Sequence, residues 1–217
     1  MTQTPIIAID GPAASGKGTL ARRIAQELGF AHLDTGALYR AVGLAVLEAG
    51  GDPTNEQQAI AAAQALKSED CANPHLKDDD VGQAASKVAS IPDVRTILLN
   101  LQKQFAANPP PPAKGAVLDG RDIGTVICPN ADVKLFIEAK TEIRAERRLK
   151  ELQSRGKDTI YEAVLKDMRE RDARDQGRKM APMMPADDAL IIDTGHLTAN
   201  QAFEKAIALI RENLPHI

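Results

Sequence analysis

IIAIDGPAASGKGTLARRIA, residues Ile6 to Ala25, is the stretch that decides the fold. Its opening residues, Ile6 to Ile9, are consecutive, apolar and rich in β-branched side chains, which predicts a strand buried on both faces of a parallel sheet. Gly11 ends this pattern. After Gly18, apolar residues recur at a four-residue spacing, at Leu20, Ile24 and Leu28. This spacing predicts a helix that stops at Gly29, so the stretch indicates strand, loop and helix.

The loop has the spacing G-x-x-x-x-G-K, with Gly11, Gly16 and Lys17 at the fixed positions. Glycines let the backbone curl until its N–H groups converge with a helix N-terminus, and the lysine adds positive charge, so the loop suits a polyphosphate. The strict pattern continues with serine or threonine, whereas this chain has Gly18 and then Thr19. A glycine-rich turn that only links strand to helix is the plainer alternative. The flanking strand and helix favour phosphate binding.

Candidate magnesium ligands follow from the loop and from strand ends. The G-K-G-T ending resembles the loop of nucleoside-monophosphate kinases, in which a hydroxyl one residue later helps to hold the metal, and this makes Thr19 the candidate on the Mg²⁺ side. Asp119 follows GAVL as a Walker-B carboxylate does, which would orient Mg²⁺ through water. The alternative is a simple turn, because Asp-Gly is a common turn pair. Asp34 poses the same choice, and we favour function for both.

Composition bounds the setting. The 217 residues suit one α/β domain, and a net charge of −3 with 3% aromatic residues gives no footprint for a long nucleic acid. Cys71 and Cys128 lie far apart without a metal-binding pattern, so we interpret them as reduced thiols of a cytoplasmic protein. The N-terminus enters a strand at once, and neither a secretion signal nor a membrane span is visible. The expected partner is a small molecule.

Short apolar runs predict four more strands, at residues 31–34, 115–119, 132–139 and 189–193. Strands separated by helical patterns indicate a doubly wound parallel sheet, which binds ligands beyond the carboxyl ends of its strands. Residues 51–114 change character: helical patterns dominate, a proline at 92 divides two of them, and NPPPPAKG returns the chain to the sheet. We interpret this segment as an insertion within a single domain covering residues 1–217.

Arginines paired with carboxylates carry the most specific chemistry. RERDARDQGR, residues 169–178, places Arg171, Asp175 and Arg178 on one face of a predicted helix. A carboxylate between two guanidiniums suits a sugar hydroxyl and a phosphate. A solvated ladder of ion pairs is the alternative, since Glu170 and Arg174 are also four residues apart. Further arginines near strand ends favour a second phosphate site, as transfer between two ligands requires, and these are Arg40, Arg95 and Arg121.

A second arginine-rich helix is predicted from Glu142 to Gly156. Its face is either an ordinary charged surface or part of a lid, in which Arg148 and Arg155 would bring positive charge over the phosphates. Closure of a lid at about residues 153–165 would exclude water, which competes with the acceptor for the phosphoryl group.

These motifs together resemble the bacterial cytidylate kinases. The resemblance runs in order through GPAASGKGT, LDTGALYRAVG, AASKVASIPDVR, DGRDIGTVICPNADVKLFIEA and RERDARDQGRKMAPMMPADDALIIDT, over nearly the whole chain. The family makes CDP or dCDP from CMP or dCMP and ATP with Mg²⁺. The resemblance therefore implies a P-loop kinase with a helical monophosphate-binding insert at residues 51–114 and a lid.

The resemblance also assigns residues. For ATP it implies Gly11, Pro12, Ala13, Ala14, Ser15, Gly16, Lys17, Gly18, Thr19 and Arg148. For the CMP phosphate it implies Thr35, Arg40 and Arg121; for the cytosine edge Ser86, Arg95 and Arg178; and for the ribose and phosphate region Arg171 and Asp175, with Asp122 in the same acceptor loop. Lys17, Arg121 and Arg171 are the expected catalytic residues, and Thr19 and Asp119 the expected metal side.

The chain departs from the family pattern twice. Thr35 stands where serine is common, which keeps the hydroxyl. Between Leu66 and Val81 the chain has only KSEDCANPHLKDDD, where the family has a longer β-rich part of the insert.

Two alternatives remain at this point: a kinase of another small acceptor, such as UMP, shikimate or dephospho-coenzyme A, or a non-catalytic nucleotide-binding regulatory protein. The second set of arginines argues against the regulatory protein, because a protein that only binds a nucleotide does not need it. The sequence has no coiled-coil pattern or exposed apolar seam, which favours a monomer.

Overall fold

The apolar run at Ile6 becomes the central strand of a sheet. The structure is a computed structural model that describes residues 4–215, and within them five strands form one sheet: β1 (Ile6–Asp10), β2 (Ala31–Asp34), β3 (Ala116–Gly120), β4 (Val133–Glu138) and β5 (Leu190–Asp193). Their order is β2-β3-β1-β4-β5, and every neighbouring pair is parallel. All five predicted strands are confirmed.

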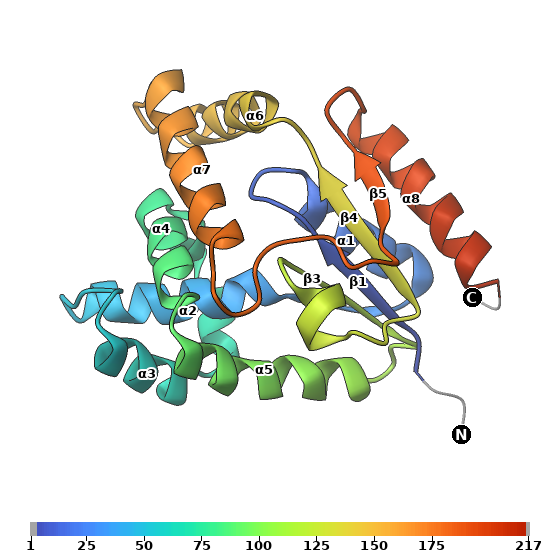
Figure 1. The fold of residues 1–217 in the computed structure, drawn as a ribbon, viewed down its shortest axis with the longest axis horizontal. Helices are drawn as coiled ribbons and strands as arrows, with labels where there is room; N and C mark the ends of the chain where they lie inside the picture. Colours follow the sequence, from blue (N-terminus) through green and yellow to red (C-terminus); the bar gives the residue numbers. More distant parts are fainter. Residues whose placement is uncertain (1–3, 216–217) are drawn as a thin grey trace.

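Helices cover both faces of this sheet (Figure 1), which confirms the doubly wound α/β class. They are α1 (Lys17–Leu28), α2 (Thr35–Glu48), α3 (Glu56–Ala65), α4 (Asp79–Val88), α5 (Pro92–Ala107), α6 (Thr141–Ser154), α7 (Tyr161–Gln176) and α8 (Ala199–Asn213). Short 3-10 turns occur at η1 (Ser68–Ala72) and η2 (Pro74–Lys77), and a π-helical turn at η3 (Ile123–Ile127).

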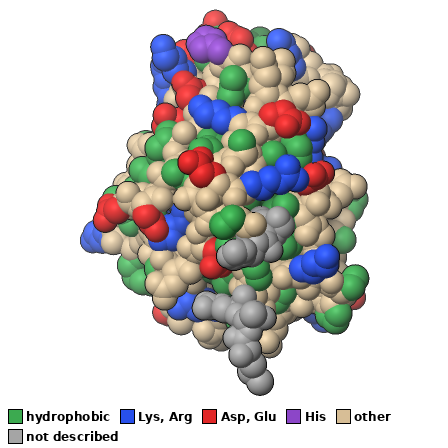
Figure 2. All heavy atoms as spheres, turned by 90° about the vertical axis from the view of Figure 1, so that its right-hand side faces the viewer, with side chains coloured by type: hydrophobic (Ala, Val, Ile, Leu, Met, Phe, Trp, Pro, Cys, Tyr) green, Lys and Arg blue, Asp and Glu red, His purple; other side chains and the backbone are tan. Residues whose placement is uncertain are grey.

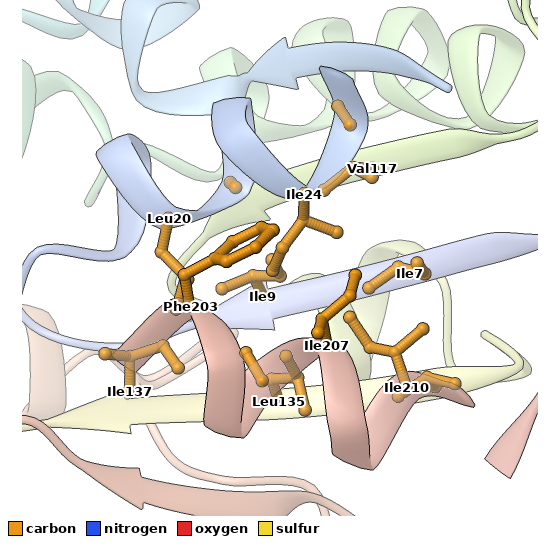
Figure 3. Packing of buried hydrophobic residues seen from close by; sticks show 14 of the residues in the cluster. Ile7, Ile9, Leu20, Ile24, Val117, Leu135, Ile137, Phe203, Ile207 and Ile210 are labelled. Carbon is orange, nitrogen blue, oxygen red and sulfur yellow. The ribbon is translucent and has the colours of Figure 1, made fainter. Parts of the chain in front are cut away.

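One face of the sheet packs against α1 and α8. Figure 3 shows Leu20 and Ile24 of α1 and Phe203 of α8 turned toward strand residues such as Ile9 and Leu135. The predicted apolar spacing of α1 is thus its buried face, and Gly29 ends the helix with φ +66°. Each of these large side chains contributes roughly 1.5–3 kcal/mol when fully buried. This packing fixes the start of α1, and with it the phosphate loop, against the sheet.

The opposite face packs against α5 and η3, and a second core forms beyond it. In that core α2 presents Leu38, Tyr39 and Val42 to α3, α4 and α5. Pro92 is the first residue of α5, a position that tolerates its missing N–H, so the predicted division between two helices is confirmed. Residues 51–114 are helical where they are regular, and the two 3-10 turns lie between α3 and α4.

The region expected to form a lid spans the junction of α6 and α7. Helix α6 ends at Ser154, α7 begins at Tyr161, and residues 155–160 connect them. In Figure 1 these two helices lie above the sheet, next to α4.

The surface of the described residues has no segregation of charge on the face that carries α8: Figure 2 shows acidic and basic side chains interspersed there. Among residues 4–215, no helix is long and apolar enough to cross a membrane.

Candidate active site

Polar side chains from distant parts of the chain surround a cavity of about 230 Å³ at the carboxyl ends of β2 and β3. The functional residues on its lining are Lys17, Gly18, Asp34, Thr35, Arg40, Ser86, Arg95, Asp119, Arg121, Asp122, Arg171, Asp175 and Arg178. The structure thus brings together every residue that the resemblance assigned to CMP. Six of these side chains are basic and four are carboxylates, so the cavity favours an anionic ligand. We refer to it as the acceptor cavity.

The phosphate loop depends on two glycines. Gly11 has φ +146°, and a Cβ there would lie 2.1 Å from the carbonyl oxygen of Ile137, so a side chain does not fit where the chain leaves β1. Gly16 has φ +89° and is the N-cap of α1. The loop therefore leads its backbone directly into a helix N-terminus, an arrangement that binds anions.

The loop separates two cavities. Ala13, Ala14, Lys17 and Gly18 line the acceptor cavity, whereas Ser15, Gly16 and Thr19 line a neighbouring cavity of about 240 Å³. Of the remaining loop residues, Gly11 and Pro12 line neither. The structure therefore offers room for a ligand on each side of the loop.

Lys17 is buried, and its Nζ donates to the carbonyl oxygen of Pro12 at 3.2 Å. Burial, together with the nearby positive charge of Arg121, lowers the pKa of Lys17 to about 7. A buried amine with a depressed pKa is a common feature of functional sites.

Gly18 lies directly beside Asp119. A Cβ added at Gly18 would be 3.5 Å from Asp119 Oδ2, so a serine or threonine hydroxyl would extend toward that carboxylate. The other oxygen, Asp119 Oδ1, is 2.7 Å from His32 Nε2. The missing side chain therefore leaves space between the phosphate loop and Asp119.

Thr19 points elsewhere. It is exposed and lines the neighbouring cavity, so the structure does not bring it together with Asp119. The reason is helix geometry: with 3.6 residues per turn, successive side chains diverge by about 100°. Thr19 and Asp119 thus line different cavities, and the assignment of both residues to the metal stays a prediction.

Asp34 and Thr35 organise the start of α2. Asp34 Oδ1 accepts from the N–H of Ala37 at 3.1 Å, and Oδ2 pairs with Arg40 Nη2 at 2.8 Å. Burial opposes the ionisation of Asp34, but Arg40, Lys17 and His32 together hold its pKa below the usual value. Thr35 Oγ1 donates to the carbonyl oxygen of Asp119 at 2.8 Å. Asp34 is thus both a helix cap and a partner that aims Arg40 at the cavity.

Asp175 joins several of the predicted binding residues. It accepts from Ser86 Oγ at 2.9 Å, from Arg121 Nε at 3.0 Å and from Arg178. Burial opposes its ionisation, yet the surrounding guanidiniums hold the pKa of Asp175 below its usual value. On the same wall Arg95 pairs with Asp122, whose pKa burial raises. These ion pairs set the side-chain positions of the acceptor cavity.

Arg171 differs from the other arginines of the cavity. Within residues 4–215 it has no ion-pair partner, and its Nε is buried without a hydrogen bond. Desolvation and the nearby positive charge of Arg121 together lower the pKa of Arg171 to about 10. A guanidinium with a buried Nε and no ion pair is therefore free to bind an anion in the cavity.

Two predictions about arginines need correction. Arg178 is not on the helical face with Arg171 and Asp175, because α7 ends at Gln176; the chain turns after it, and Arg178 reaches Asp175 from the turn. The alternative of a surface ladder is wrong for Arg174, which contacts Ser86 and Gln83 instead of Glu170.

Arg148 lies outside the acceptor cavity. It pairs with Asp79 at 2.8 Å and with Glu151 at 3.0 Å, and it lines a third cavity of about 210 Å³ together with Ala13 and Ala14. Arg155, from the same helix end, donates to the carbonyl oxygen of Lys77 at 3.0 Å. Both arginines thus contact the segment between η2 and α4.

Sequence reasoning missed several residues. Tyr39 lines the acceptor cavity, and the Arg95 guanidinium lies 5.7 Å from its ring centroid. Asp10 accepts from the N–H groups of Ile123 and Gly124, both at 2.8 Å, which holds the loop that carries Arg121. Their positions next to quoted motifs were the available signal, but the partners are more than 50 residues away in sequence.

A parallel sheet with a phosphate loop after β1 and an arginine-lined second cavity defines a P-loop kinase of a small acceptor. The family model described as Cytidylate kinase matches residues 7–212. The chain belongs to the cytidylate kinase family.

Relatives agree over nearly the full length. The chain is 60% identical over 205 residues to the cytidylate kinase of Paramagnetospirillum magneticum, covering 94% of this chain and 97% of that protein. It is 58% identical to the cytidylate kinase of Rhodospirillum rubrum, covering 94% and 96%. An uncharacterized protein from Eubacterium ventriosum, 15% identical, has a similar fold, with a TM-score of 0.55 over 95% of this chain and 98% of that one.

Proposed function

We propose that this enzyme transfers the γ-phosphoryl group of ATP to CMP or dCMP, giving ADP and CDP or dCDP. The observation that carries the proposal is Arg171, which is half-buried, makes no ion pair among residues 4–215, has a buried Nε without a hydrogen bond, and lines one cavity with Lys17 and Arg121. In phosphoryl transfer, negative charge spreads over the equatorial oxygens of the transferred group, and fixed cations around that point stabilise it. We assign these three residues the catalytic role.

ATP would lie along the phosphate loop. Residues 11–19 would bind its phosphates, and the neighbouring cavity would take its nucleoside, because Thr19, Leu197 and Arg147 line it next to the loop. Arg147 is fixed there, donating to the carbonyl oxygen of Thr194 at 2.6 Å. Arg148 would reach the phosphates from the third cavity once its pair with Asp79 opens.

Magnesium fits beside Gly18. The space between the loop and Asp119 is open because position 18 has no side chain, and Asp119 is held on its other oxygen by His32. No group of three or more His, Cys, Asp or Glu side chains within residues 4–215 suits a metal ion, so phosphates and water would supply most ligands. When bound, the ion neutralises phosphate charge. We assign Asp119, through water, to the metal, and Thr19 to the ATP side.

CMP would occupy the acceptor cavity. Thr35, Arg40 and Arg121 would bind its phosphate, while Arg171, Asp175 and Asp122 would contact the ribose and phosphate region. Ser86, Arg95 and Arg178 would read the base, since cytosine presents an amino donor and two acceptors to a hydroxyl and to guanidiniums. On uracil, N3 carries a proton, so a guanidinium aimed at N3 meets another donor.

Residues 51–114 would form the monophosphate-binding insert, and about 153–165 the lid. The two already touch, because Arg155 of the lid donates to the carbonyl oxygen of Lys77 in the insert. Closure would exclude water from the phosphoryl group. We also propose that the chain acts as a monomer.

A coupled assay of ADP formation tests the function. CMP, dCMP, UMP, AMP, shikimate and dephospho-coenzyme A are compared at fixed Mg²⁺ and ATP, with ATP alone as the control. We expect CMP and dCMP to give the highest kcat/KM. Preference for another acceptor would reject the proposal, and no turnover with any of them would favour a nucleotide-binding regulatory protein.

A further inference from the structure

Arg174 makes contacts that the binding site alone does not explain. Its Nη2 donates to Gln83 Oε1, and its Nε lies 3.4 Å from Ser86 Oγ. Gln83 in turn lies with its Nε2 3.5 Å from the carbonyl oxygen of Asp167 on α7. Arg174 is partly buried and is not on the lining of the acceptor cavity, so it acts on a ligand only through Ser86.

The hydrogen of the Ser86 hydroxyl is already committed. Ser86 Oγ lies 2.9 Å from Asp175 Oδ1, and an ionised carboxylate only accepts hydrogen bonds. The guanidiniums around Asp175 keep it ionised, as its lowered pKa indicates. Ser86 must therefore be the donor in this pair.

The oxygen of Ser86 has two lone pairs, and Arg174 approaches one of them. An arginine only donates, so this contact is possible only while the serine oxygen accepts. One lone pair then remains for the ligand. With its hydrogen on Asp175 and one lone pair on Arg174, Ser86 is an acceptor toward the cavity.

We propose that Arg174 is a positioning residue for base selection: by donating to Ser86 Oγ, it holds that hydroxyl as an acceptor toward the base. This inference rests on the proposed assignment of Ser86 to the cytosine edge. Cytosine carries an N4 amino group, which donates to an acceptor, whereas uracil carries O4, which only accepts. Asp175 takes the hydrogen of Ser86, and Arg174 adds a second restraint on the same oxygen. Without Arg174 the hydroxyl leaves Asp175 more readily and can donate to O4 of uracil, so the site tolerates uracil better.

The test compares kcat/KM for CMP and UMP in wild type and in Arg174→Gln. The matched control is Arg169→Gln on the same helix, where an exposed arginine pairs with Glu142 at 2.9 Å. We expect Arg174→Gln to lower the CMP-to-UMP ratio by about three- to tenfold, the effect of one ordinary hydrogen bond, with KM for ATP unchanged. The control should leave the ratio as in wild type.

A double-mutant cycle shows whether the effect passes through the serine. In a Ser86→Ala background, Arg174→Gln should not change the ratio further. Arg174→Lys keeps the charge but lacks the planar guanidinium group, so it should also lower the CMP-to-UMP ratio. This variant replaces Arg174→Gln in the test if the glutamine variant has a lower melting temperature.

An equal loss for CMP and UMP, or an additive effect in the Ser86→Ala background, would overturn the proposal. Failure of the proposed function looks different, because wild type itself would then show no preference for CMP.

Discussion

The phosphate loop and the acceptor cavity lie at the same edge of the sheet, but different forces hold them. The shape of the loop depends on its backbone. Gly11 lies too close to the carbonyl oxygen of Ile137 for any side chain, and Gly16, five residues later, is the N-cap of α1. The acceptor cavity is built from side chains, and its central contacts join Asp175 to Ser86 and Arg121, which are 89 and 54 residues away in sequence.

This difference predicts different responses to mutation. A site formed mainly by backbone, such as the phosphate loop, is sensitive to a larger side chain at its glycines and to loss of its one charged side chain, Lys17. A side-chain site distributes its effect over a network, so individual losses change affinity and specificity before they abolish turnover. Arg171 is the exception on the acceptor side, because it belongs to no ion pair among the described residues.

The largest expected effect is on the loop side. Lys17→Ala should lower kcat by about three orders of magnitude or more, because the lysine charge acts on the β and γ phosphates as they become more negative. The fold should persist, since within residues 4–215 the Lys17 side chain makes one hydrogen bond, to the carbonyl oxygen of Pro12. Single-turnover kinetics and a thermal melt measure the two quantities. Turnover within a few-fold of wild type would show that the loop binds without a catalytic lysine.

The second prediction compares two arginines, one without and one with an ion-pair partner. Arg171→Gln should lower kcat/KM by about 10²-fold and leave the melting temperature nearly unchanged, because Arg171 makes no ion pair among residues 4–215. Arg144→Gln is the matched control, since Arg144 pairs with Asp172 at 2.6 Å and also donates to the carbonyl of Ala13.

Breaking that buried pair should cost about 3–5 kcal/mol of unfolding free energy. Urea unfolding of both variants separates the outcomes. A marked loss of stability in Arg171→Gln would mean that it has a structural partner role, against the proposed catalytic one.

The third prediction concerns the uptake of a proton by Lys17 when a nucleotide binds. Burial lowers the pKa of Lys17 to about 7, so in the free enzyme the amine is mostly neutral at pH 8 and mostly charged at pH 6. Bound phosphates favour the charged form and raise this pKa. Binding of a nucleotide at pH 8 should therefore take up close to one proton, and binding at pH 6 almost none.

Calorimetry in buffers of different ionisation enthalpy measures the uptake, and Lys17→Arg, which stays charged, should abolish it. Burial raises the pKa of Asp10 to about 7, so this carboxyl group also titrates in the same pH range. It would contribute to the measured proton uptake only if nucleotide binding shifted the pKa of Asp10. Equal uptake in Lys17→Arg would assign the proton to that carboxylate.

The sequence predicted local features best. The five strands, the helix after Gly18 and the break at Pro92 follow from periodicity and chain chemistry over a few residues. The acceptor residues came from a family resemblance, since neither spacing nor composition places Ser86 next to Asp175. Arg178 was misplaced because α7 ends at Gln176, with Gly177 as its C-cap, and helical spacing alone ignores this local stop. The alternative pairing of Arg174 with Glu170 was wrong because Arg174 instead contacts Ser86 of α4, which is 88 residues away in sequence.

The smallest expected effect returns to the residue after Gly18. Thr19 and Gly18 are adjacent in α1, yet Thr19 faces the cavity beside Arg147 whereas Gly18 faces Asp119. Thr19→Val keeps the shape of the side chain and removes one hydroxyl, so it should raise KM for ATP by only a few-fold, as expected for one hydrogen bond to an exposed ligand.

The Mg²⁺ dependence of Thr19→Val should match that of wild type. Gly18→Ser should shift that dependence, because the new hydroxyl would extend toward the open space beside Asp119. The test is a titration of activity with Mg²⁺ at fixed ATP for both variants, with ADP binding measured in the presence and absence of the ion. If the Mg²⁺ concentration for half-maximal activity changed in Thr19→Val and not in Gly18→Ser, the threonine would be assigned to the metal.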